Sequence, residues 1–196
     1  FKRGLKGVSD ADVEALLSRP SLAGCAHYVG RLREAAEKTM SLPEEHLAAD
    51  LGVNGLHAWG RLYDNVSGKL EFEMAWPDGR TERLPMSQRR SLLSNPDRAV
   101  RRAAFDGGNA AWEGVIDVTA AAINAIGGTR LSLNEHRRIE HFLDVALYQS
   151  KITRASLDAL FSAIHEKRHV AQKVLQIKAQ EQGTAGVAWY DLEAPL

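Results

Sequence analysis

The chain contains little of what would tie it to a membrane or to a disulfide framework. Cys25 is its single cysteine, which excludes an internal disulfide and any zinc site built from several cysteines. No apolar run approaches the roughly 18 residues of a membrane span, and no signal-peptide core follows the N-terminus. One thiol fits a reducing compartment, so we expect a cytoplasmic protein. The chain begins at Phe1 rather than Met, and we expect that residues before it have been removed.

An excess of charge of either sign is also absent, because 25 Lys and Arg balance 25 Asp and Glu. Without a net field, the chain as a whole attracts neither nucleic acid nor a membrane surface. Arginines do gather in one region, at Arg89, Arg90, Arg98, Arg101 and Arg102. The neighbouring Asp97 and Asp106 favour a solvated helix face there, and no aromatic side chains interleave with the arginines as they do in nucleic-acid sites. We therefore expect no nucleic-acid partner and no membrane partner.

What the sequence does contain is a series of helix signals. Two capping-box patterns, Ser9–Asp12 and Ser41–Glu44, predict helix starts. The helix that follows the second pattern is expected to break or bend near Gly52 or Gly55. Thr153 is expected to cap the last long helix.

Another long helix is predicted in the middle of the chain. Asn95 is its expected cap, with Pro96 at the first helical position. Its expected end is the glycine pair at 127–128, after which Asn134 opens the next helix. The glycine pair at 107–108 costs ~1 kcal/mol per residue relative to alanine, which predicts a bend or a closely packed neighbouring backbone.

One segment changes from helical to alternating periodicity. In KLEFEMAW (69–76), apolar and polar residues alternate, which predicts a strand with one buried face. Pro77, Asp78 and Gly79 form a turn, and RTERLPM (80–86) returns as a shorter partner. The expected fold is mainly α-helical, a bundle-like lobe with one inserted antiparallel β-hairpin at about 69–86.

The string His165-Glu166-Lys167-Arg168-His169 fits H-E-x-x-H. In that pattern two histidines one helical turn apart bind zinc and the glutamate is the general base. The predicted helix places both histidines on the flank of an apolar stripe. Lys167 and Arg168 argue against zinc, because two adjacent cations raise the potential where a divalent ion must lie.

A zinc site of this kind also needs a third ligand. Glu193 follows His169 at about the sequence distance seen for a ligand from a later helix. The surrounding Gly183, Gly186 and Pro195 disfavour a helix there, so no supporting shell is expected. We predict that the string is incidental and that the chain holds no catalytic, cofactor-binding or metal-ligating residue.

The order of several segments resembles the oligoendopeptidase F family, zinc metallopeptidases related to thimet oligopeptidase. The segments are LPEEHLAADL (42–51), AWGRLYD (58–64), the predicted hairpin, SNPDRAVRRAAFDGGNAAW (94–112), AAINAIGG (121–128), HFLDVALYQSKITRASLDALFSAI (141–164) and AWYDLEAPL (188–196). The most specific pieces are RRAAF and WYDLEAPL, and the similarity covers nearly the whole chain.

The resemblance implies an activity whose centre lies outside this sequence. Such enzymes cut short peptides in a deep cleft between helical lobes, and their zinc motif lies downstream of the WYDL-AP segment. We therefore expect an N-terminal fragment that is inactive alone. Zinc, oligopeptide substrates and the missing catalytic half are implied for the parent protein.

The resemblance also divides the chain. Residues 1–41 form N-terminal helices, 42–106 resemble the family's N-terminal segment with the hairpin, and 107–196 resemble the start of the catalytic domain. The alternative is a free-standing, non-catalytic helical module that binds peptides or proteins. Exposed apolar surface separates the two, because a part of a larger protein leaves uncovered the face that the remainder would bury.

Overall fold

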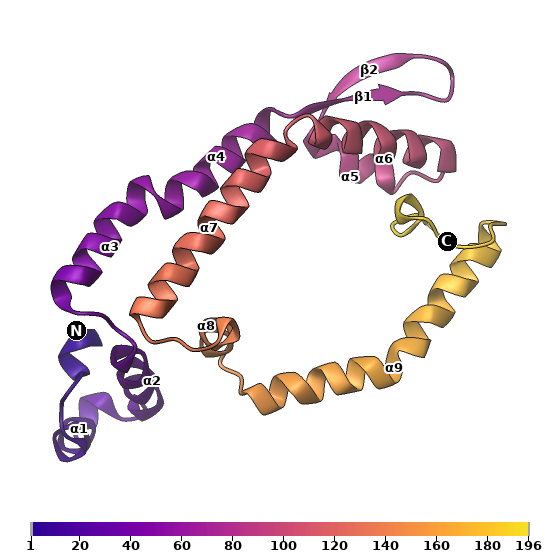
Figure 1. Ribbon diagram of the computed structural model, residues 1–196. Coiled ribbons are helices and arrows are strands. Elements are labelled where there is room, and N and C mark those ends of the chain that lie inside the picture. Colours follow the sequence, from indigo (N-terminus) through magenta and orange to yellow (C-terminus); the bar gives the residue numbers. More distant parts are fainter. Residues whose placement is uncertain (1, 196) are drawn as a thin grey trace.

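The computed structural model describes residues 2–195, which form helices arranged in an open arc with one two-stranded sheet (Figure 1). The α-helices are α1 (Asp10–Leu17), α2 (Ala26–Glu37), α3 (Leu42–Asn54), α4 (Leu56–Lys69), α5 (Arg89–Leu93), α6 (Arg98–Glu113), α7 (Ile116–His136), α8 (Phe142–Ser150) and α9 (Arg154–Glu181). Short 3₁₀ helices are η1 (Lys2–Leu5), η2 (Pro20–Leu22), η3 (Met86–Gln88) and η4 (Trp189–Asp191). The predicted mainly helical fold with one inserted hairpin is confirmed. Within residues 2–195, no helix combines the length and the apolar character that a membrane crossing requires.

The hairpin forms where the periodicity changes. Strand β1 (Glu71–Ala75) pairs antiparallel with β2 (Thr81–Pro85), and the turn contains Gly79 at φ +89°. Phe72 and Met74 are almost fully buried on one face, packed with Val100 and Ala104 of α6. Burial of these side chains fixes the register, since a shift by one residue would expose both.

Glycine at position 107 lets α6 approach the hairpin closely. A Cβ at Gly107 would lie 2.1 Å from the carbonyl oxygen of Glu73, whereas real atoms never approach so closely. The predicted close neighbouring backbone is therefore confirmed, and it is strand β1. Close contact between α6 and β1 forms the main core of the structure.

Several predicted helix starts are confirmed by their caps. The Ser9 side chain accepts a hydrogen bond from the Asp12 N–H, and Thr153 caps α9 in the same way. Ser41 and Glu44 form a complete capping box at the start of α3. The expected break lies at Gly55, between α3 and α4.

The predicted boundaries around α6 and α7 are wrong. Asp97, not Asn95, caps α6, because its carboxylate accepts from the Ala99 N–H at 2.8 Å. The break lies at 114–115, and α7 then continues through the glycine pair at 127–128 to His136, so that Asn134 lies inside it.

Two glycines alone did not end α7. The packing of α7 along α4 offsets a cost of about 1 kcal/mol per glycine. The next helix, α8, starts at His141, whose Nδ1 accepts from the Leu143 N–H.

The helices lie on two sides of the arc (Figure 1). α3 and α4 lie beside α7 on one side, where Arg137 pairs with Glu45 at 2.7 Å. α2 contacts α8 through the Tyr148 hydroxyl, which donates to the Arg31 carbonyl at 2.7 Å. α9 forms the other side and returns the chain to α6 through η4.

Candidate functional site

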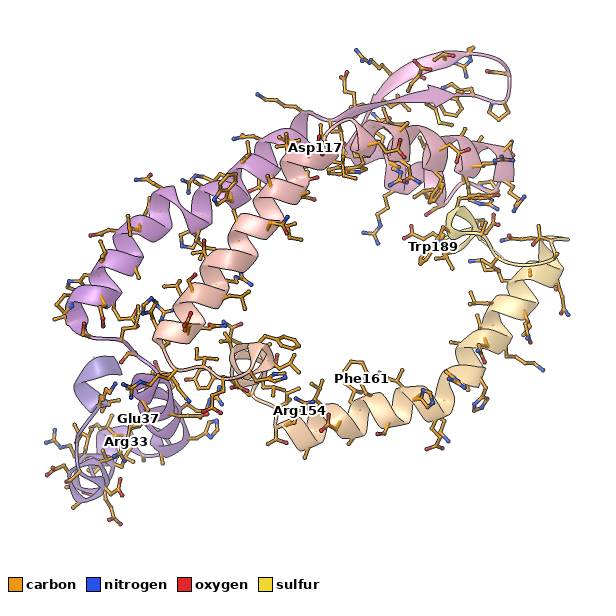
Figure 2. All side chains as sticks on the ribbon, viewed as in Figure 1. Arg33, Glu37, Asp117, Arg154, Phe161 and Trp189 are labelled. Atoms are coloured by element: carbon orange, nitrogen blue, oxygen red, sulfur yellow. The ribbon has the colours of Figure 1, made fainter. Side chains whose placement is uncertain are left out.

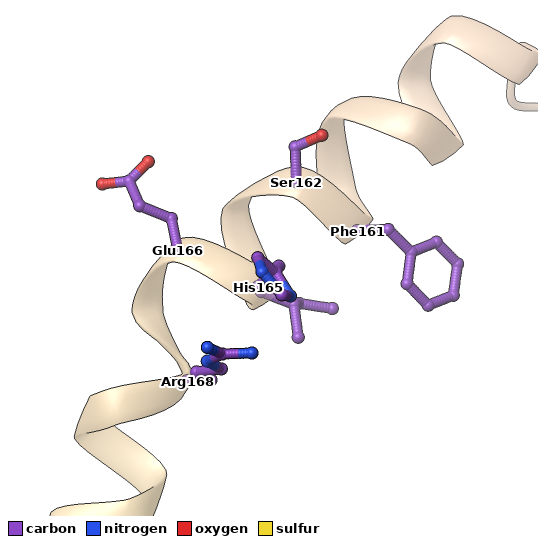
Figure 3. A pocket seen from close by; sticks show the side chains of 6 residues that line it. Phe161, Ser162, His165, Glu166 and Arg168 are labelled. Carbon is purple, nitrogen blue, oxygen red and sulfur yellow. The ribbon is translucent and has the colours of Figure 1, made fainter.

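The zinc-like string lies in the middle of α9, on an exposed part of the helix. His165 and His169 are both exposed, and the Nδ1 of His169 lies 3.1 Å from the Glu166 carbonyl oxygen. The Glu166 carboxylate pairs instead with Lys167 at 2.7 Å. A shallow hollow beside the helix is lined by α9 alone, and Figure 3 shows the side chains of Glu166 and His165 leaving the helix in different directions. A zinc-protease site is buried or lies in a cleft, and this surface is neither.

A third metal ligand does not reach the histidines. Glu193 lies near α5, with its Oε2 3.4 Å from the Ser94 hydroxyl and 4.0 Å from the Arg90 Nε. Within residues 2–195, no three His, Cys, Asp or Glu side chains gather in a way that could hold a metal ion. Two histidines leave half of a tetrahedral zinc sphere to water.

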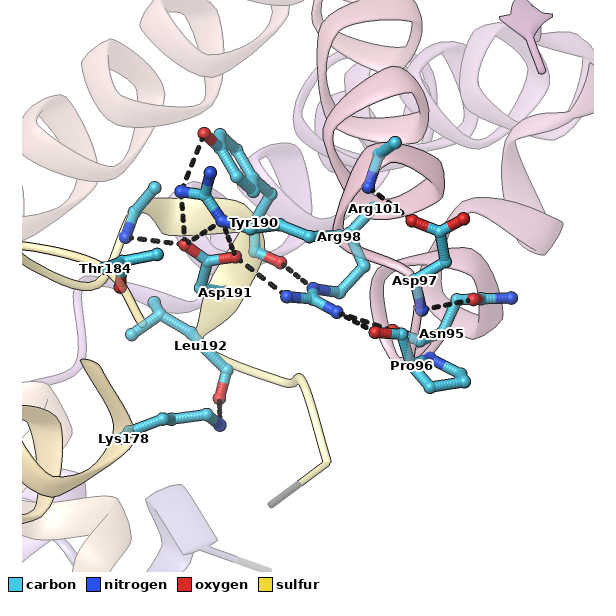
Figure 4. Close-up of polar contacts among 12 residues, drawn as sticks. Asn95, Pro96, Asp97, Arg98, Arg101, Lys178, Thr184, Tyr190, Asp191 and Leu192 are labelled. Carbon is cyan, nitrogen blue, oxygen red and sulfur yellow. Dashed lines mark hydrogen bonds and ion pairs between the residues drawn. The ribbon is translucent and has the colours of Figure 1, made fainter. Parts of the chain in front are cut away.

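The best-organised polar cluster joins η4 to α6 (Figure 4). Asp191 is fully buried and Arg101 is 2% exposed, and their Oδ1 and Nη2 atoms lie 3.0 Å apart. Arg98 donates to the same carboxylate from Nε at 3.1 Å and from Nη2 at 3.0 Å. The Ala188 N–H also donates to Asp191 Oδ2, and Arg101 Nε donates to the Tyr190 carbonyl. We call Arg98, Arg101 and Asp191 the arginine–aspartate cluster.

Two opposed effects set the charge of Asp191. Burial alone would raise its pKa, because a buried carboxylate loses hydration. Hydrogen bonds from Arg98 and Arg101, with that of the Ala188 N–H, outweigh burial and hold the pKa of Asp191 below its usual value. The carboxylate raises the pKa of Arg98 in return. Asp191 is therefore a fixed anion that anchors the C-terminal segment, and it has no free position for a ligand.

The expected solvated arginine face is wrong for two of its members. Arg101 is buried, and Arg89 is half-buried, donating to Asn109 Oδ1 at 2.7 Å and to carbonyl oxygens of α6. Arg102 does match the expectation, since it is exposed and pairs with Asp106 at 3.5 Å. Long arginine stems can bury while their guanidinium groups find fixed acceptors, which charge counting along a helix does not reveal.

Sequence reasoning missed Asp191. The residue lies about 90 positions after its partners in the chain, and no local spacing connects them. The sequence hint that Asp191 is buried was its position as one acidic residue inside the otherwise apolar string Trp-Tyr-Asp-Leu. A buried carboxylate there requires a cationic partner, and a surplus of arginines at the start of α6 could have suggested one.

The middle of α9 exposes several large apolar side chains. Every residue from 158 to 177 is exposed. The large apolar side chains there are Leu160, Phe161, Ile164, Val170, Val174, Leu175 and Ile177, each between 41% and 61% exposed. Figure 2 places Phe161 on the inner side of the arc, as it does Trp189, which is 77% exposed.

Comparisons with known proteins give a family match over part of the chain and the fold of the whole chain. Residues 5–72 match the family model described as Oligopeptidase F, which confirms the resemblance in the N-terminal part of the chain. The whole chain superposes on a predicted peptidase from Chlamydophila abortus with a TM-score of 0.85 and on oligoendopeptidase-F from Enterococcus faecium with 0.82, each at 19% identity. Among curated proteins, none matches this sequence.

The two solved structures are much longer than this chain. The matched regions make up 33% and 38% of them, so the chain spans about a third of their length. At 19% identity the likeness shows the fold alone.

Proposed function

We propose that this chain is the N-terminal part of a zinc metallo-oligopeptidase of the oligoendopeptidase F type, and that it is inactive by itself. Its arc would form one side of the cleft in which the parent protein cleaves short peptides. The proposal also places the parent protein in the cytoplasm.

One observation carries the proposal. All 196 residues fit the fold of an oligoendopeptidase-F while covering only 38% of that protein, and the family match at residues 5–72 agrees with this placement. Superposition over the whole chain supports a contiguous part of such an enzyme more strongly than it supports a short shared motif.

The residues present do not fit the implied zinc ion. His165 and His169 are exposed, and Glu193 is engaged near α5. We therefore assign no step of peptide hydrolysis to residues of this chain, and propose that the remaining polypeptide supplies the ligands and the general base. This part of the protein contributes structure only: its helices form one side of the cleft, and the arginine–aspartate cluster holds η4 on α6.

The exposed apolar surface also favours this proposal over a free-standing binding module. A module that evolved to be soluble alone would bury most of its large apolar side chains, whereas α9 leaves seven exposed between 158 and 177. Part of a larger protein would leave such a surface uncovered.

Zinc content tests the proposal. The purified full-length parent protein should contain about one zinc per chain, and the 196-residue chain should contain almost none after dialysis. Replacing both histidines of α9, His165→Ala with His169→Ala, should leave the zinc content of the parent protein unchanged. Loss of zinc in that double variant, or retention of stoichiometric zinc by the 196-residue chain, would place the metal in α9 and overturn the proposal.

A further inference from the structure

Among residues 2–195, no other element covers the middle of α9. Leu157 is partly buried near the start of the helix and Ala179 is buried near its end, while all residues from 158 to 177 are exposed. Twenty helical residues extend for roughly 30 Å. Most helical stability in proteins comes from packing an amphipathic face. A helix this exposed is therefore expected to pack permanently against other polypeptide.

The exposed side chains divide into two faces. At about 100° per residue, Leu160, Phe161, Ile164, Ala171 and Leu175 fall within roughly a third of the circumference. A polar flank, made of Gln172, His165, Asp158, Gln176, His169 and Ser162, adjoins one edge of this set. Arg168 lies within its arc, and Val170, Val174 and Ile177 lie beyond its other edge. We call the first set the α9 apolar face.

The C-terminal end of α9 is tied to α6 through η4, which orients this face. At the C-terminal end Lys178 donates to the Leu192 carbonyl at 2.7 Å, and the arginine–aspartate cluster holds η4 on α6. At the other end Thr153 caps the helix directly after α8. Figure 2 shows Phe161 turned toward the inside of the arc, the same side as Trp189.

We propose that the α9 apolar face is the docking surface for the remaining polypeptide of the parent protein, which covers it with apolar side chains of its own. This inference rests on the proposed function. This chain covers 33% and 38% of the solved structures that share this fold, so in each of them the same arc belongs to a protein with more than its own length of additional polypeptide.

The shape favours this occupant over two others. A second copy of the chain would have to bring its own α9 into the concave side of the arc, where α7 and α8 already border the space (Figure 1). A short peptide substrate would leave the face bare between turnovers. Covalently connected polypeptide covers it permanently and at high effective concentration.

A pair of variants tests the surface. Phe161→Asp places a charge on the apolar face, and Ser162→Asp places the same charge on the polar flank, about 150° from the middle of that face. Both positions are exposed in the 196-residue chain, so neither change should alter its unfolding transition appreciably. In the full-length parent protein, Phe161→Asp should lower the folding equilibrium constant at least about tenfold, while Ser162→Asp should not.

Hydrogen exchange supplies a readout that does not depend on variants. Amides from 158 to 177 should exchange at least about a hundredfold more slowly in the full-length protein than in the 196-residue chain. If the milder Phe161→Ala is needed because Phe161→Asp prevents folding, it should still increase exchange in this segment. Equal exchange in the two proteins would overturn the inference, as would a concentration-dependent dimer of the 196-residue chain that protects this segment.

The two proposals fail separately. If α9 becomes protected in the full-length protein but that protein holds no zinc, the docking surface stands and the peptidase proposal falls. If the full-length protein binds zinc while α9 stays unprotected, the peptidase proposal stands and the docking surface falls.

Discussion

Removing the carboxylate of Asp191 should detach the C-terminal segment from α6. In Asp191→Ala, Arg101 keeps the carbonyl acceptors of Asn95 and Pro96 but loses the ion pair with Asp191, although Arg101 itself is 2% exposed. Breaking a buried pair by deleting one partner costs about 3–5 kcal/mol. Carbonyl contacts to Arg101 place the expected loss near the lower end, about 3 kcal/mol. Loss of the Arg98 ion pair adds little to the loss of stability, since the Arg98 side chain is 43% exposed and can be hydrated instead.

Two measurements locate this loss. Chemical denaturation gives the free energy of unfolding, and hydrogen exchange of the amides at 188 and 191 detects local release of η4 when the rest of the chain stays folded. Asp106→Asn is the matched control, because it breaks the exposed Arg102–Asp106 pair and should cost less than about 1 kcal/mol. If Asp191→Ala changes neither quantity by more than the control, the cluster does not hold the segment.

Three further predictions concern pH, glycine and metal. The folded-state pKa of Asp191 is lowered, so its contribution to stability is complete above the unfolded value of about 3.9 and is lost as the pH falls through the folded pKa. The stability difference between the wild type and Asp191→Asn should therefore be constant above about pH 5 and shrink below about pH 4 in denaturant titrations; a gap that widens on acidification would contradict it. Gly127→Ala should stabilise the chain by about 0.5–1 kcal/mol, since nothing lies within 4 Å of the added Cβ, whereas Gly107→Ala should destabilise it by about 1–3 kcal/mol through the clash with β1. Equal effects of the two changes in thermal unfolding would refute the close packing. His165→Ala and His169→Ala should each change the stability of the metal-free chain by less than about 0.5 kcal/mol, and one equivalent of zinc should not raise the melting temperature of the wild type by many degrees.

Local signals in the sequence were enough for the hairpin and for most helix starts. Alternation in 69–76 and the Pro77–Gly79 turn predicted β1 and β2 because one face had to be buried. Capping by Ser41 or Thr153 depends on atoms within a few residues, so the chain itself contains the information.

The incorrect predictions concern features that depend on packing between residues far apart in the sequence. Glycines at 127–128 predicted a helix end, but α4 packs along α7 and keeps it helical. The buried pair of Arg101 and Asp191 joins residues 90 positions apart, which no spacing rule could find in one sequence. The division at residues 41 and 106, the absence of ligand residues and the cytoplasmic location stay predictions.

The resemblance predicted the fold over its whole length, because a conserved order of segments carries tertiary information that propensities lack. For the candidate site, the exposed surroundings of His165 agree with the reasoning from Lys167 and Arg168. Neither line of reasoning anticipated how much of α9 would be left bare between 158 and 177.

Peptide hydrolysis tests the central claim most directly. An internally quenched oligopeptide should be incubated with the 196-residue chain and with the full-length parent protein, each with zinc and with a chelator, and Glu166→Gln should be introduced into both. The full-length protein should cleave the peptide, lose activity with chelator and keep it in Glu166→Gln, while the 196-residue chain should be inactive under every condition. Chelator-sensitive cleavage by the 196-residue chain that disappears in Glu166→Gln would contradict the account, because it would make the string on α9 a catalytic centre.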